Sequence, residues 1–199
     1  LPAPAWSEAG QGEALIVADP TEDLASARTE GRRVADQLPE TWSTRRLEGR
    51  EATGPALRRY LPQADLFHYA GHGRFAGRGG WESALPLAGD SRLTVADILA
   101  LERAPRHVVL SACETAKSTP GGQVESVTGL AHAFLTAGSR SVVAAVRPVE
   151  DRTAATLVRH YYAAWSKGAP PPEALRQAQL ELRRHDPAAD WASFRLLEP

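Results

Sequence analysis

The sequence has 199 residues, 43% of them hydrophobic and 24% charged, which suits one soluble globular domain with a sizeable core. Its 23 Lys and Arg residues nearly balance 24 Asp and Glu residues, so the formal net charge of −1 excludes a strong attraction to nucleic acid or to an anionic membrane. No apolar run reaches the ~18 residues of a membrane span, and the lone cysteine predicts a reducing, cytoplasmic location without disulfides.

The first residues predict how the chain is organised. Residues 1–12 are rich in Pro, Ala and Gly and are predicted to form a linker or arm in front of a domain at residues 13–199. The chain begins at Leu1 and contains no Met, so we expect it to be a piece of a longer protein.

The remaining sequence alternates between short apolar runs and longer segments of helical periodicity. In chain order we predict strand 14–18, helix 21–38, strand 42–47, helix 53–61, strand 65–70, a loop or hairpin at 74–89, helix 94–101, strand 107–112, helix 124–137, strand 141–146, helices 151–165 and 173–184, and an edge strand at 194–197. Nearly all-apolar strands are typical of parallel sheets covered on both faces. The alternation therefore predicts an α/β fold with a mostly parallel central sheet.

Two residues with catalytic capacity follow neighbouring predicted strands. His72 comes directly after the strand at 65–70, and Cys113 follows the strand at 107–112, 41 residues later. Ligands of open α/β sheets bind outside the carboxyl ends of the strands. If the two strands pair, their ends lie about 5 Å apart, and the two side chains can face one cleft.

The residue types at these strand ends suit nucleophilic catalysis. A thiol needs a base or an electropositive surrounding to act as a nucleophile at neutral pH, and an imidazole supplies that base. Gly73 has a backbone N–H that a substrate carbonyl can approach, and together with the N–H of Cys113 it can form an oxyanion hole. We also expect Gly71 to let the chain turn off the strand.

Each of these residues has a structural alternative. Free cysteines are often simply buried, small hydrophobic residues, although the place of Cys113 at a strand end favours the nucleophile. His68 is the rival base, but it lies within its strand and is expected to pack under a helix. His107 begins its strand at the far end of the sheet and is expected to be structural. No paired-cysteine spacing supplies the four ligands of a structural zinc site, so no metal is predicted.

The surrounding sequence resembles a known family. Residues 67–73 (FHYAGHG) and 108–115 (VVLSACET) resemble the two signature blocks of CHAT domains, which are bacterial and eukaryotic relatives of caspases and separases. Three further stretches are similar to later blocks of the family, at residues 129–143, 151–162 and 173–179.

The resemblance implies a caspase-like three-layer α/β/α sandwich and a cysteine endopeptidase with a Cys–His dyad. By position, Cys113 matches the nucleophile, His72 the catalytic histidine and Gly73 the glycine of the oxyanion hole. The chain departs from the family where Arg147-Pro148-Val149 replaces a frequent Trp-Pro-Val, in a loop that lines the substrate cleft of relatives. No metal or organic cofactor is implied.

Four residues are candidates for binding the substrate. Asp19 and Asp151 lie at the carboxyl edge of the predicted sheet, where carboxylates favour a basic residue before the scissile bond, but each is equally expected as a helix N-cap. Arg147, a positive charge in the same region, would instead disfavour a basic residue before the scissile bond. Ser111 is predicted to face the pocket, and an apolar preference stays open.

The sequence thus predicts a cysteine endopeptidase that cuts protein substrates through a thioester on Cys113. Regulatory domains of the parent chain, helical repeats in similar proteins, are the expected partners. The alternative is an inactive caspase-like scaffold that binds a protein partner.

Overall fold

A computed structural model describes residues 11–74, 80–113, 125–146 and 149–199. The arm predicted at the N-terminus falls almost entirely outside this part. Among the described residues, no helix combines the length and the apolar character needed to cross a bilayer.

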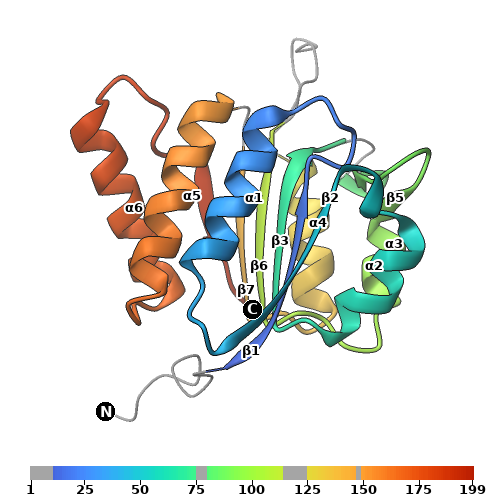
Figure 1. Cartoon of the computed structure of the whole chain (residues 1–199). Coiled ribbons are helices and arrows are strands. Elements are labelled where there is room, and N and C mark those ends of the chain that lie inside the picture. Colours follow the sequence, from blue (N-terminus) through green and yellow to red (C-terminus); the bar gives the residue numbers. More distant parts are fainter. Residues whose placement is uncertain (1–10, 75–79, 114–124, 147–148) are drawn as a thin grey trace.

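The centre of the molecule is a six-stranded sheet in the order β2-β1-β3-β6-β7-β8 (Figure 1). The first five strands of that order run parallel, and only β8 is antiparallel to its neighbour, which confirms the predicted mostly parallel sheet. The strands are β1 (Gly12–Ala18), β2 (Trp42–Glu48), β3 (Leu66–His72), β6 (His107–Cys113), β7 (Ser141–Ala145) and β8 (Phe194–Leu197).

Helices cover both faces of the sheet, so the predicted three-layer sandwich is confirmed (Figure 1). One layer holds α1 (Ala25–Gln37), α5 (Asp151–Trp165) and α6 (Pro171–His185). The other holds α2 (Gly54–Tyr60), α3 (Val95–Leu99) and α4 (Glu125–Thr136). Alternate residues of the strands belong to two separate hydrophobic cores. In β3, Phe67 and Tyr69 pack on the α2–α4 side, whereas Leu66 packs on the α1–α5 side.

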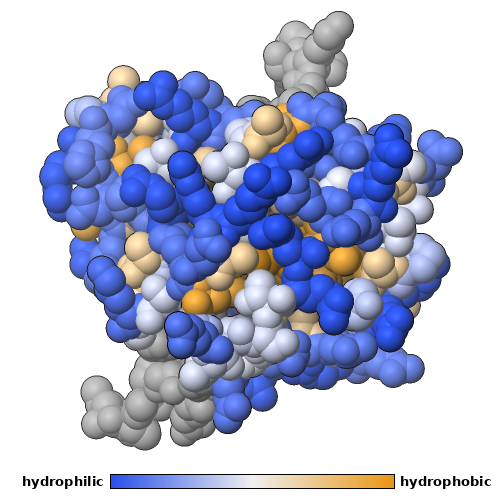
Figure 2. Space-filling model, in the orientation of Figure 1, coloured by the Kyte–Doolittle hydropathy of each residue, from blue (hydrophilic) through white to orange (hydrophobic). Residues whose placement is uncertain are grey.

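Close packing fixes α1 over the sheet. A Cβ added at Gly31 would lie 2.6 Å from the Cβ of Ala18, so only glycine lets the helix approach β1 this closely. At the edge of the sheet, β2 exposes Arg45 and Arg46, and charged residues of this kind discourage pairing with another chain. Figure 2 shows that the face carrying α1 and β2 is largely hydrophilic, with apolar side chains visible between polar ones.

Several element boundaries differ from those predicted. The first helix begins at Ala25 rather than at residue 21, because Asp19 and Glu22 adopt positive φ angles of 46° and 62° and residues between them form a turn. The strand predicted at 65–70 continues to His72. The loop or hairpin predicted at 74–89 contains β4 (Ala84–Pro86), which pairs antiparallel with β5 (Arg92–Thr94) beyond the predicted segment.

Candidate active site

The two predicted catalytic residues meet at the carboxyl edge of the sheet. β3 and β6 are neighbouring parallel strands, and their register pairs His72 with Cys113 as the last residue of each strand. Paired positions on adjacent strands lie about 5 Å apart. This pairing places the backbone of Cys113 beside that of His72.

His72 is held by an acidic residue that the sequence did not single out. Its Nε2 lies 3.0 and 3.1 Å from the two carboxylate oxygens of Asp23, in the turn between β1 and α1. Thr21 donates a hydrogen bond of 2.5 Å to the same carboxylate. The Thr21 hydroxyl has the largest effect and lowers the pKa of Asp23; desolvation opposes it, and His72 adds a further lowering, so that the pKa is lowered overall. The carboxylate is therefore charged near neutral pH.

This contact determines which imidazole nitrogen can act as a base. An ionised carboxylate only accepts hydrogen bonds, so Nε2 of His72 carries the proton that it donates to Asp23. In the neutral ring the lone pair then sits on Nδ1. The arrangement suits a general base whose Nδ1 accepts a proton while Nε2 stays bound to an acid.

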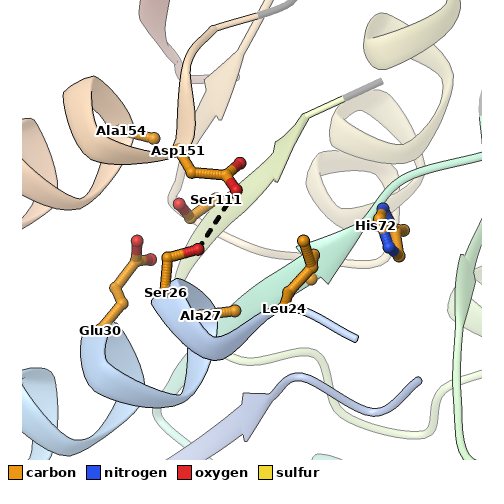
Figure 3. A pocket seen from close by; sticks show the side chains of 9 residues that line it. Leu24, Ser26, Ala27, Glu30, His72, Ser111, Asp151 and Ala154 are labelled. Atoms are coloured by element: carbon orange, nitrogen blue, oxygen red, sulfur yellow. Dashed lines mark hydrogen bonds between the residues drawn. The ribbon is translucent and has the colours of Figure 1, made fainter. Parts of the chain in front are cut away.

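A pocket beside His72 collects polar groups from three elements (Figure 3). Ser26 and Glu30 come from α1, Ser111 from β6 and Asp151 from the first turn of α5. Ser26 donates a hydrogen bond of 3.2 Å to Asp151. The pocket therefore has two carboxylates in its wall, one at the exposed rim and one at depth.

Glu30 is the deep carboxylate of this pocket. It is 5% exposed, and its Oε1 lies 3.1 Å from Nε2 of His68, which is completely buried. The two atoms are close enough for an ion pair when the imidazole is protonated. Glu30 therefore combines a buried contact with His68 and a place in the pocket wall.

The predicted substrate residues fall into three groups. Ser111 and Asp151 line the pocket. Asp151 does not cap its helix, because Glu150 occupies the N-cap position. Arg147 lies outside the described residues.

Asp19 has a different environment from Asp151. It is completely buried and accepts hydrogen bonds of 2.9 Å from the backbone N–H groups of Asp23 and Leu24, while Arg28 binds its other oxygen at 2.5 Å. Its carboxylate thus orders the turn that carries Asp23. The alternative role of a helix N-cap is wrong for Asp19, because the N-cap of α1 is Leu24 and no side chain caps that helix.

Gly71 has a role other than the predicted turn. It lies inside β3, and a Cβ at this position would come within 2.9 Å of the Tyr69 hydroxyl oxygen and 3.0 Å of Pro20 Cδ. The Tyr69 side chain extends over Gly71, and its hydroxyl lies 2.8 Å from the carbonyl oxygens of His72 and Pro86. Glycine is required here for space.

The other two histidines weighed in the sequence, His68 and His107, occupy structural positions. His68 lies under α1 and α5, with its Nδ1 3.3 Å from the Tyr162 hydroxyl. His107 lies at the opposite end of the sheet, with its Nδ1 2.8 Å from the Ser141 hydroxyl oxygen. Burial, together with Arg140 and Arg106, lowers the pKa of His107 to about 4. Among the described residues no cluster of three or more potential metal ligands occurs.

Two solved structures share this architecture. The separase of a Saccharomyces cerevisiae separase–securin complex matches with a TM-score of 0.62 and 15% identity, over 94% of this chain and 12% of the separase chain. The Arg-specific cysteine proteinase gingipain R matches with a TM-score of 0.65 and 11% identity, over 94% of this chain and 46% of its own. The fold is therefore the caspase-like α/β sandwich.

The family follows from the sequence itself. The model of the CHAT domain matches residues 2–198, so the chain belongs to the CHAT domain family. The search among curated proteins returned no significant match. The chain spans a small part of separase and less than half of gingipain R.

Proposed function

We propose that this chain is the peptidase domain of a larger protein and that it cuts protein substrates through Cys113 and His72. The observation that carries the proposal is the register of His72 with Cys113 at the carboxyl ends of β3 and β6, in a member of the CHAT family. Residues two apart on a strand share a face. Cys113 ends β6 two positions after Ser111, which lines the pocket next to His72.

The proposed reaction is acyl transfer in two steps. His72 Nδ1 takes the proton of the Cys113 thiol, and the thiolate attacks the peptide carbonyl. The C–N bond then breaks, the amine leaves with the proton from His72, and a thioester remains. Water, deprotonated by His72, hydrolyses the thioester and regenerates the thiol. The N–H groups of Gly73 and Cys113 stabilise the oxyanion in both steps.

Asp23 has a supporting role in this mechanism. Its contact with Nε2 keeps the proton on that nitrogen and stabilises the imidazolium that forms when Nδ1 accepts the thiol proton. Thr21 in turn fixes the carboxylate.

The pocket favours a basic residue before the scissile bond. Asp151 at the rim and Glu30 at depth offer carboxylate oxygens, and Ser111 and Ser26 offer hydroxyls. A guanidinium carries five donors and matches such a set better than an apolar side chain. The Arg-specific gingipain R, which has the same fold, is consistent with this preference.

The proposal also covers the regulation, the partner and the location of the protein. Because the chain spans only 12% of the separase chain, we assign regulation to other parts of the parent protein. A protein partner is supported by the separase structure, which is a complex with securin. A cytoplasmic location suits a lone nucleophilic cysteine, which must stay reduced.

Two measurements test the activity. Iodoacetamide should label Cys113 much faster in wild type than in His72→Ala, because the imidazole generates the thiolate. Cleavage of a diverse peptide pool should show a basic residue before the cut, and His72→Ala should lower kcat/KM by about 10²–10⁴-fold. Cys113→Ala is the control for contaminating proteases. Equally slow labelling of wild type and His72→Ala, without cleavage, would instead support the binding scaffold.

A further inference from the structure

The Tyr69 hydroxyl contacts the peptide unit that carries the proposed oxyanion donor. The carbonyl of His72 and the N–H of Gly73 belong to one peptide group. The Tyr69 hydroxyl oxygen is 2.8 Å from that carbonyl oxygen and also 2.8 Å from the carbonyl of Pro86 in β4. A hydroxyl has one proton to donate, so the two carbonyls share it. Tyr69 thereby joins the end of β3 to the neighbouring hairpin.

The contact sets the direction of the Gly73 N–H. No peptide bond of the described chain is cis. In a planar trans peptide the C=O and N–H bonds point in opposite directions. Tyr69 packs in the core on the α2–α4 side and draws the His72 carbonyl toward that side. The N–H of Gly73 therefore points toward the opposite side, where the His72 side chain meets Asp23 and where the pocket opens.

Other contacts make this arrangement rigid. Tyr69 is completely buried, and Gly71 leaves the space through which its hydroxyl reaches His72. Directly after Gly73, Arg74 and Ala84 exchange two backbone hydrogen bonds of 2.9 and 2.8 Å. Burial, followed by the nearby charges of Asp19 and Asp23, raises the pKa of Tyr69, so the hydroxyl keeps its proton in any working buffer.

We propose that Tyr69 is a positioning residue of the peptidase: its hydroxyl clamps the His72–Gly73 peptide and keeps the Gly73 N–H aimed at the oxyanion. This inference rests on the proposed function, because an oxyanion forms only if Cys113 attacks a carbonyl. A preorganised donor needs no reorientation during the reaction. The sequence Tyr69-Ala70-Gly71-His72-Gly73 then forms one unit in which Gly71 makes room for the clamp.

The test compares two reactions of the same thiol in the intact protein. Hydrolysis of a peptide develops an oxyanion, whereas alkylation by iodoacetamide is a displacement at carbon that develops none. Tyr69→Phe removes the hydroxyl and keeps the ring. We expect kcat/KM for the peptide that wild type cleaves best to fall about tenfold, less than the 10²–10³-fold that follows complete loss of an oxyanion donor. The alkylation rate should change less than twofold.

A second probe and a control separate this role from a structural one. The aldehyde of the same peptide adds to the thiolate and forms an oxyanion analogue, so its binding should weaken by the same factor as kcat/KM. Tyr161→Phe is the control, because Tyr161 is a buried tyrosine on α5 that packs on Tyr162 and does not line the pocket. It should leave hydrolysis and aldehyde binding unchanged.

The possible results decide between the proposals. Tyr69→Phe with unchanged hydrolysis, or with alkylation reduced as much as hydrolysis, overturns the role of Tyr69 and leaves the peptidase intact. A wild type that neither cleaves peptides nor shows His72-dependent alkylation refutes the proposed function itself, and the role of Tyr69 with it.

Discussion

Replacing Asp23 by Asn removes the negative charge beside His72 while keeping the size of the side chain. The carboxylate makes two contacts of 3.0 and 3.1 Å with Nε2. A hydrogen bond to a charged group contributes about 1.5–3 kcal/mol, but the Asp23 side chain is 59% exposed. We therefore discount the contribution for solvent screening to about 1 kcal/mol, which corresponds to about a fivefold loss in rate.

The assay is the rate of iodoacetamide labelling of Cys113 together with kcat/KM, measured between pH 6 and 8. The pKa of Asp23 is lowered in the fold, so the charged contact is present above the ordinary carboxyl pKa and is lost only as the pH falls through the lowered value. The carboxylate is thus charged throughout this window. Asp36→Asn, at an exposed position of the following helix α1, is the matched control. An unchanged rate in Asp23→Asn, or an equal loss in Asp36→Asn, would refute the role of Asp23.

Three further substitutions have measurable consequences. Asp151→Asn should lower kcat/KM about five- to tenfold for peptides with Arg before the cut; Glu150→Gln is its control, and an equal loss for Leu peptides would contradict the assigned pocket. The pKa of His107 in the folded protein is about 4, below its value in the unfolded chain. The unfolded chain therefore binds a proton at His107 before the folded protein does, and the folded state is stabilised near pH 7 and loses this stabilisation as the pH falls toward 4. Between pH 7 and 4 the free energy of unfolding, measured in urea, should therefore fall by up to about 3 kcal/mol more in wild type than in His107→Gln; parallel curves would refute this. Gly31→Ala places a Cβ 2.6 Å from that of Ala18 and should cost about 1–3 kcal/mol in the same assay, unlike the exposed Arg33→Ala.

The fold was predictable because its signals are local. Each buried parallel strand is a short apolar run between helices, and the carboxyl ends of such strands gather at one edge. That topology alone brought His72 and Cys113 together, although they are 41 positions apart. Boundaries depend on side-chain contacts instead. The first helix starts four residues later than its periodicity suggests, because Asp19 binds the N–H groups of residues 23 and 24 and forms a turn.

The same turn explains why Asp23 was not found. With the helix predicted to start at residue 21, position 23 belonged to its first turn, where an acidic residue is expected in any case. Its closeness to His72 depends on the register of β1 with β3, which places the end of β1 beside the end of β3. Glu30 could not be predicted as a pocket residue for a similar reason. Helical periodicity gives a residue its face, but the pocket facing Glu30 is made by β6 and α5, far away in sequence.

The two faces of β3 have different roles in the proposed mechanism. His68 and His72 lie on the α1–α5 side, where one contacts Glu30 at depth and the other contacts Asp23 at the rim. On the α2–α4 side, the Tyr69 hydroxyl contacts the His72 carbonyl, and Gly71 leaves room for it. A substitution on the first side should therefore change the substrate preference or the base. A substitution on the second side should change oxyanion stabilisation alone, which is why Tyr69→Phe and Asp23→Asn should differ in their effect on alkylation.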